Sequence, residues 1–221
     1  MDKIYTKNGK IDSIKLMNGE EIECKILVMA IGVTPDTSFI TKGDLKTGRG
    51  ILVDERMQAS KENIYAAGDI IEGFDKLLGE SRGIAIWPLA VKQGIVAGAN
   101  MAGEEKKYSG GFFMNSVEIL GTPSISLGIT NIEEDEASGI EIIREYRPLE
   151  KRYKKIVIRD NKIIGAIMVG NIERAGIYAG LIENEVNLTG VKENILKEDF
   201  GIIHLPADYK KHLVVGEGVE V

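Results

Sequence analysis

A run of small residues that ends on a Gly-Asp pair is the feature that most constrains the fold of this chain. Residues 63–70 read Asn-Ile-Tyr-Ala-Ala-Gly-Asp-Ile. The apolar stretch 64–67 is typical of a short buried strand. A strand of such small residues lets another group approach the backbone closely where it ends, at Gly68 and Asp69.

A helix start follows this motif. Residues 87–90 read Trp-Pro-Leu-Ala, and the pattern predicts a helix over residues 88–102. Pro88 suits the first helical position, because its missing N–H group would have no partner there. Gly94 and Gly98 lie four residues apart on one face of this helix and predict close packing on a sheet.

The two motifs together predict a site for a flavin. The Asp69 carboxylate suits the ribityl hydroxyls, and free amides at Leu89 and Ala90 suit negative charge on a reduced ring, since they lie at the positive end of the helix. Each motif alone is a common match, so a plain turn and a plain helix start stay the alternative. The pair in this order is a stronger signal than either part.

Composition bounds the class of protein. The 221 residues are enough for one large domain or two small ones, and 43% hydrophobic and 28% charged residues are ordinary for a globular chain. The net charge of -6 argues against a general nucleic-acid role. The single cysteine, Cys24, cannot form an intramolecular disulfide. With no secretion signal and no apolar run of about 20 residues, we expect a cytoplasmic protein without a membrane span.

The first residues predict β-structure. Asn8-Gly9 and Asn18-Gly19 predict type I′ hairpin turns, which need positive φ at both central residues. Between them, residues 11–16 roughly alternate as a half-buried strand does. The apolar run at 26–32 predicts a strand covered on both faces, which ends at Gly32.

The last part of the chain predicts an α+β module. The helix predicted over 172–186 has an apolar stripe, which we interpret as core packing. His204 and His212 have no readable ligand partners, so no metal site is predicted. The acidic run 133–136 predicts a solvated helix start. Strands are predicted at residues 116–120, 124–128, 141–146, 153–158 and 162–169.

Three blocks carry a resemblance to a known family: residues 27–37, 50–69 and 87–103. In this order they resemble the C-terminal half of an FAD-dependent pyridine nucleotide-disulfide oxidoreductase. The resemblance is to the branch that contains NADH oxidases, rubredoxin reductases and nitrite reductase-like flavoproteins. Beyond Tyr108 the resemblance is looser.

The resemblance implies a fold and an activity. It implies an incomplete α/β FAD/NAD(P)-binding region followed by an α+β interface domain, with boundaries at 1–36 for the end of the NAD-binding domain, 37–106 for the second FAD-binding segment and 107–221 for the dimerisation domain. Electrons would pass from NAD(P)H through FAD to an acceptor. The flavin-contacting residues would be Gly68, Asp69, Leu89 and Ala90, and Gly32 would let the backbone cross between the nucleotide domains.

The departures from the family pattern limit what the chain can do alone. It contains no Gly-x-Gly-x-x-Gly turn for cofactor phosphates, and Cys24 lies far from any catalytic cysteine position. We therefore expect no catalysis by this chain alone; the alternative is a stand-alone dimerisation or interaction module. The basic residues between 144 and 159 suit either a solvated face or docking of an acidic redox carrier such as rubredoxin. A homodimer is also implied by the resemblance.

Overall fold

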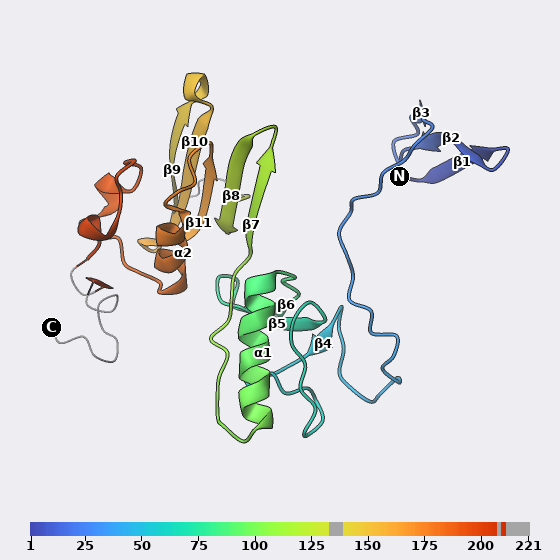
Figure 1. Ribbon diagram of the computed structural model, residues 1–221, viewed down its shortest axis with the longest axis horizontal. Helices are drawn as coiled ribbons and strands as arrows, with labels where there is room; N and C mark the ends of the chain where they lie inside the picture. The colour runs from blue at the N-terminus through green and yellow to red at the C-terminus, as the bar shows by residue number, and fades with distance from the viewer. Residues whose placement is uncertain (133–138, 207–208, 211–221) are drawn as a thin grey trace. The chain divides into compact units, whose positions relative to one another are not determined.

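The computed structural model describes residues 1–132, 139–206 and 209–210 (Figure 1). The chain divides into two compact units, Met1–Thr34 and Pro35–Val221. The acidic run at 133–136 and His212 lie outside the described residues.

The first unit is a three-stranded antiparallel sheet. Its strands β1 (Lys3–Lys7), β2 (Lys10–Lys15) and β3 (Glu21–Glu23) are paired in that order. Asn8 and Gly9 have φ values of 53° and 73° between β1 and β2, which confirms the type I′ turn.

The second turn of this unit differs from its prediction. Gly19 has a φ of 90°, whereas Asn18 does not adopt positive φ. The Gly19 amide donates to the Leu16 carbonyl at 3.0 Å, and the Leu16 amide donates to the Glu20 carbonyl at 2.8 Å. The connection is therefore a three-residue loop, a tight turn closed by a left-handed glycine, in which only the glycine needs the special conformation.

The strand predicted at 26–32 does not form. Ile26, Val28 and Ile31 are 81%, 81% and 90% exposed. A strand covered on both faces needs neighbouring strands and covering helices, and among the described residues nothing pairs with this segment. Gly32 has a φ of 85° and open space around it, so the backbone here takes a conformation that suits glycine.

The second unit begins with a small mixed sheet and a long helix. The sheet consists of β4 (Ile51–Leu52), β5 (Ile71–Asp75) and β6 (Glu80–Arg82), with β4 parallel and β6 antiparallel to β5. The helix α1 (Trp87–Met101) confirms the predicted helix almost to the residue. Its inner face packs in a core that contains Met57, Ile71, Val96, Ala97 and Tyr108.

Two predictions for this region are wrong. Residues 64–67 form no strand; Tyr65 makes an isolated bridge to Gln58. Gly94 and Gly98 do not pack on a sheet, because both are exposed and a Cβ added to either would meet nothing within 4 Å. The helix buries the opposite face instead.

The described residues of the rest of the second unit include a five-stranded antiparallel sheet and the helix α2 (Figure 1). The sheet order β7-β8-β11-β10-β9 joins three hairpins. Asp160 and Asn161 have φ values of 49° and 59°, which confirms the tight turn predicted there. The elements are β7 (Met114–Ile119), β8 (Thr122–Gly128), β9 (Ile140–Arg147), β10 (Arg152–Arg159), β11 (Lys162–Val169), α2 (Ala175–Glu183) and the 3-10 helices η2 (Pro148–Glu150), η3 (Lys192–Asn194) and η4 (Ile202–His204).

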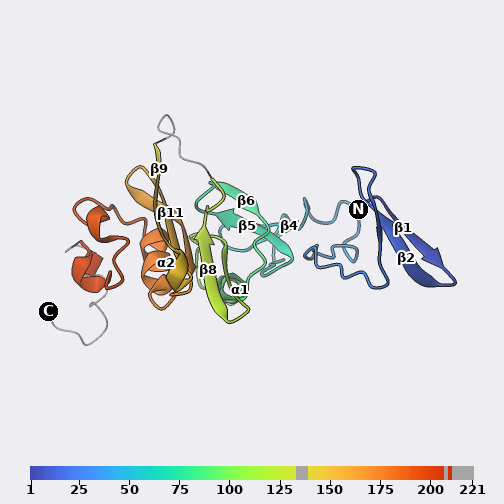
Figure 2. The ribbon, with the colours of Figure 1, turned by 90° about the horizontal axis from the view of Figure 1, so that it is seen from above.

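The helix α2 packs beside β11, as Figure 2 shows, and supplies the main core of the molecule. It is shorter than the predicted 172–186, but the stripe contributes to the core as predicted. Ala175, Ile182 and Val186 are buried, and Ile172 and Ala179 are partly buried against the same cluster. The predicted α/β region followed by an α+β module is therefore confirmed.

The basic residues between 144 and 159 do not share one solvated face. Consecutive residues of a strand point to opposite faces of the sheet. Lys154 donates to the Leu196 carbonyl at 3.2 Å, whereas its neighbour Lys155 donates to the Thr130 carbonyl at 2.8 Å. Most of these cations are thus held by the fold.

Candidate functional site

The Gly68-Asp69 turn lies against the first turn of α1. Gly68 has a φ of 85°, and a Cβ built on it would lie 3.5 Å from the Ala90 Cβ. A side chain at Gly68 would have ordinary contact with the helix but a strained backbone. The structure therefore places the Gly68-Asp69 motif beside the Trp87-Pro88-Leu89-Ala90 motif, which follows it by about 20 residues in the sequence.

A buried glutamine connects the turn to the helix. The Gln93 Oε1 atom accepts a hydrogen bond from the Gly68 amide at 2.8 Å, and its Nε2 atom donates to the Tyr108 hydroxyl at 3.3 Å. Gln93 is 3% exposed and Tyr108 is 5% exposed. Burial raises the pKa of Tyr108, so its hydroxyl stays neutral in this network. This bridge holds the turn in place.

The bridge was missed by sequence reasoning. Gln93 follows Leu89 by four residues and precedes Ala97 by four, and both of those residues are buried on the inner face of α1. A polar residue on the buried stripe of a helix needs a partner. The helical periodicity therefore indicated that Gln93 is buried and hydrogen-bonded. Nothing in the sequence identified its partners, Gly68 and Tyr108.

The start of α1 has no cap of its own. Ile86 at the N-cap position provides no side-chain hydrogen bond, and the first turn contains no acidic residue. Among the described residues, the Leu89 amide has no hydrogen-bond acceptor. The Ala90 amide donates to the Ile86 carbonyl at 3.1 Å, so only the first of the two amides expected to be free is free. An uncompensated positive helix end stabilises a negative or electron-rich ligand.

Asp69 follows Gly68 in the same turn. Its side chain is exposed and makes no hydrogen bond within the described part of the chain. An exposed carboxylate, an unpartnered amide and an open helix start thus lie on two elements that Gln93 joins. Chemically, they can accept hydrogen bonds from hydroxyls and stabilise developing negative charge.

The other candidate residues lie elsewhere. Gly32 belongs to the first unit. Cys24 is partly buried, and its amide donates to the Asp12 carbonyl at 3.1 Å, as expected for a hairpin residue. His204 stacks on Phe200 with ring centroids 5.9 Å apart. No group of residues that could hold a metal ion occurs among those described.

No helix in the described ranges has the length and apolar character required to cross a membrane.

Comparison with family models gives two adjacent matches. Residues 2–94 match the model described as pyridine nucleotide-disulphide oxidoreductase. Residues 114–186 match the rubredoxin NAD+ reductase C-terminal domain. The first match contains the Gly68-Asp69 turn and the start of α1, and the second covers the five-stranded sheet and α2.

Individual relatives agree with these matches. The chain is 30% identical over 185 residues to the nitrite reductase [NAD(P)H] of Bacillus subtilis. The aligned region covers 82% of this chain and 22% of the relative. It is 32% identical over 170 residues to the NADH-rubredoxin oxidoreductase of Clostridium acetobutylicum, covering 77% of this chain and 40% of the relative.

A solved structure shows the same fold. The NAD-dependent persulfide reductase from A. fulgidus superposes with a TM-score of 0.71 at 24% identity, over 86% of this chain and 38% of that chain. The chain thus spans less than half the length of each of these relatives.

Proposed function

Because this chain belongs to the pyridine nucleotide-disulfide oxidoreductase family, we propose that it supplies the second flavin-contacting segment and the C-terminal domain of an FAD-dependent NAD(P)H oxidoreductase. The single observation that carries the proposal is the bridge from Gly68 through Gln93 to α1. It fixes an exposed carboxylate and an open helix start on adjoining elements.

The residues present fit the ring and ribityl part of FAD. Gly68 supplies the left-handed backbone of the turn beside Ala90, Asp69 would accept hydrogen bonds from the ribityl hydroxyls, and the Leu89 amide would donate to the electron-rich edge of the ring. When bound, FAD supplies the acceptance of a hydride from NAD(P)H and the release of electrons to an acceptor. The chain's own residues bind, orient and stabilise charge.

The outer face of α1 supports the proposal that more protein covers this site. Trp87, Val91, Ile95 and Met101 are 83%, 45%, 55% and 69% exposed. So apolar a stripe on one helix is typical of a surface that another part of a protein covers. We assign the cover to the nucleotide-binding portion that carries the cofactor phosphates, since the chain contains no Gly-x-Gly-x-x-Gly turn. In this proposal, catalysis requires the nucleotide-binding portion, because that portion binds the cofactor phosphates.

The electron acceptor is proposed to be a small acidic carrier such as rubredoxin, in keeping with the name of the Clostridium relative. Arg144 and Lys151 are the exposed members of the basic residues between 144 and 159. Replacing both with Glu in the complete enzyme should slow carrier reduction at low salt far more than at high salt, because complementary charge mainly raises encounter rates. A cytoplasmic homodimer completes the proposal.

The flavin site can be tested on the chain itself with riboflavin, which has the ring and ribityl chain but no phosphate. In an NMR titration, we expect shifts of the Gly68, Asp69 and Leu89 amides, and their loss in Asp69→Ala. Glu62→Gln is a matched control, because Glu62 is also exposed and makes no hydrogen bond in the described structure. A titration without shifts at these amides would contradict the proposal. A chain that forms a tight dimer in sedimentation and shows no riboflavin-dependent shifts at these amides would favour the stand-alone interaction module.

A further inference from the structure

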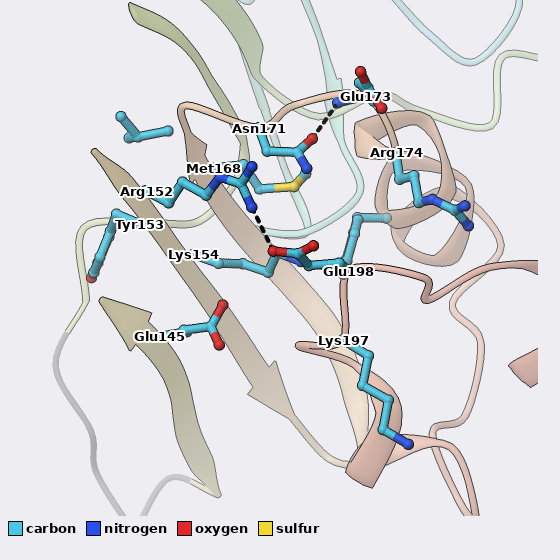
Figure 3. A pocket seen from close by; sticks show the side chains of 12 residues that line it. Glu145, Arg152, Tyr153, Lys154, Met168, Asn171, Glu173, Arg174, Lys197 and Glu198 are labelled. Carbon is cyan, nitrogen blue, oxygen red and sulfur yellow. Dashed lines mark hydrogen bonds and ion pairs between the residues drawn. The ribbon is translucent and has the colours of Figure 1, made fainter. Parts of the chain in front are cut away.

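A pocket in the C-terminal part of the chain is lined by residues between Glu145 and Glu198 (Figure 3). Its walls come from β9, β10, β11, α2 with the residues just before it, and the segment that contains Lys197 and Glu198. Tyr178 and Met168 form an apolar wall and are 1% and 2% exposed. Charged side chains surround the rest, so the balance of their charges decides what the pocket can bind.

Two of the acidic residues in the pocket are already neutralised. Glu198 pairs with Arg152 at 2.5 Å and with Arg147 at 3.2 Å, and Figure 3 shows the Arg152–Glu198 contact. Glu145 pairs with Arg147 at 2.8 Å. The remaining carboxylate in the lining, that of Glu173, is exposed.

Lys154 is a cation in this pocket without a carboxylate partner. Its Nζ atom donates to the Leu196 carbonyl at 3.2 Å and lies 5.7 Å from the centre of the Tyr178 ring. Within the described ranges, no carboxylate lies within 4.0 Å of it. Burial lowers the pKa of Lys154, against the weaker opposing effects of the charges of Glu145 and Glu198. A bound anion would give the Lys154 ammonium group the negatively charged partner that it lacks within the described ranges.

Arg174 adds a second positive group at the rim. Its Nη1 atom donates to the carbonyls of Asp199 and Phe200 at 3.0 and 3.2 Å, and no ion pair to it is found in the described structure. The helix α2 begins directly after Arg174, with no side-chain cap and no acidic residue in its first turn. The potential in the pocket is therefore positive, and the apolar wall strengthens it by lowering the local dielectric.

We propose that this pocket binds a small oxyanion, the phosphate or carboxylate group of a metabolite, with Lys154 as its main contact. The site is separate from the flavin site and goes beyond the proposed redox function. The ligand would lie between the sheet and the segment at 196–198. It would stabilise the folded state by binding that state alone.

The test is an NMR titration of the whole chain with inorganic phosphate and, separately, with succinate, at ionic strength held constant with sodium chloride. We expect saturable shifts around Lys154 for at least one of the two anions, and the arm with the tighter binding identifies the group. Lys154→Met should weaken binding at least tenfold. Lys155→Met is the matched control, because its side chain lies on the opposite face of β10 and bonds to Thr130.

A second variant keeps the proposal testable if Lys154→Met does not fold. Glu173→Gln removes the exposed negative charge in the lining and should tighten binding about two- to threefold, in line with a surface charge effect. Shifts that grow linearly with both anions, or equal losses in Lys154→Met and Lys155→Met, would overturn the proposal. Weaker binding in Glu173→Gln would do the same.

Discussion

Replacing Gln93 with Met tests the bridge on which the candidate site depends. Methionine has nearly the same length, so the cavity effect is small and the change removes mainly two hydrogen bonds. The Gly68 amide loses an acceptor at 2.8 Å, and the Tyr108 hydroxyl loses a donor at 3.3 Å. A buried group left without a partner costs about 1–3 kcal/mol. Gly68 is only partly buried and water can replace part of its loss, so we expect about 2 kcal/mol in total.

Amide hydrogen exchange measures this effect where it occurs. A loss of about 2 kcal/mol speeds exchange through local opening roughly 30-fold, since about 1.4 kcal/mol corresponds to a factor of ten. The Gly68 amide and the core around Met57, Ile71 and Val96 should show it. Amides of the five-stranded sheet, which belongs to another core cluster, should change little.

Gln58→Met is the control for this experiment. Gln58 is partly buried, and its side chain makes no hydrogen bond in the described structure, so the same chemical change should cost less than about 0.5 kcal/mol. If Gln93→Met and Gln58→Met have equal effects, or if exchange at Gly68 stays as slow as in the parent chain, the reasoning is refuted.

Three further predictions use the same physical arguments. Gly98→Ala should stabilise the chain by about 1 kcal/mol in thermal unfolding, because the glycine lies in an exposed helix interior with open space around it; a loss of stability would contradict this. Gly111→Ala should destabilise it by about 1–3 kcal/mol, because the new Cβ would lie 2.6 Å from a Leu89 methyl carbon; a neutral result in urea unfolding would show that Leu89 can move. Tyr178→Phe should cost about 0.5–1.5 kcal/mol at neutral pH, because the hydroxyl donates to the Ile195 carbonyl at 2.6 Å. Burial raises the pKa of Tyr178, so above about pH 10 the unfolded chain releases a proton that the folded chain keeps, and stability falls by up to about 1.4 kcal/mol per pH unit. The Phe variant should lack that part of the alkaline loss, and parallel pH profiles of the two proteins would refute the assignment.

Local signals in the sequence were sufficient where the structure depends on neighbours along the chain. The turns at Asn8-Gly9 and Asp160-Asn161 need only residues that tolerate positive φ, and both formed as predicted. The helix that begins with Trp87-Pro88 needs only its own periodicity and a residue suited to its first turn. One contact between distant residues, the approach of Gly68 to Ala90 in α1, was also predicted, because the two motifs were interpreted as parts of one site.

The failures share a different cause. The apolar run at 26–32 and the small residues at 64–67 have strand composition, but a strand forms only where another strand pairs with it. Gln93 could be placed on the buried stripe of α1, but its two partners are 25 and 15 residues away in the chain. Asn18-Gly19 failed for another reason. The same dipeptide suits both a two-residue type I′ turn and a three-residue loop, so it does not determine the loop length.

Two of the wrong predictions concern apolar surface that is exposed in this structure. Ile26, Val28 and Ile31 form an exposed apolar segment, and the outer stripe of α1 with Gly98 forms another. Both segments have the apolar composition of buried segments. An exposed apolar surface of this extent is typical of a protein–protein or domain interface. Gly98→Ala tests whether the proposed nucleotide-binding portion covers this face of α1. The variant should stabilise this chain, because the added methyl group meets nothing within 4 Å, but it should weaken association with that proposed portion. Equal association of the parent and the variant would mean that this face of α1 is not where that portion packs.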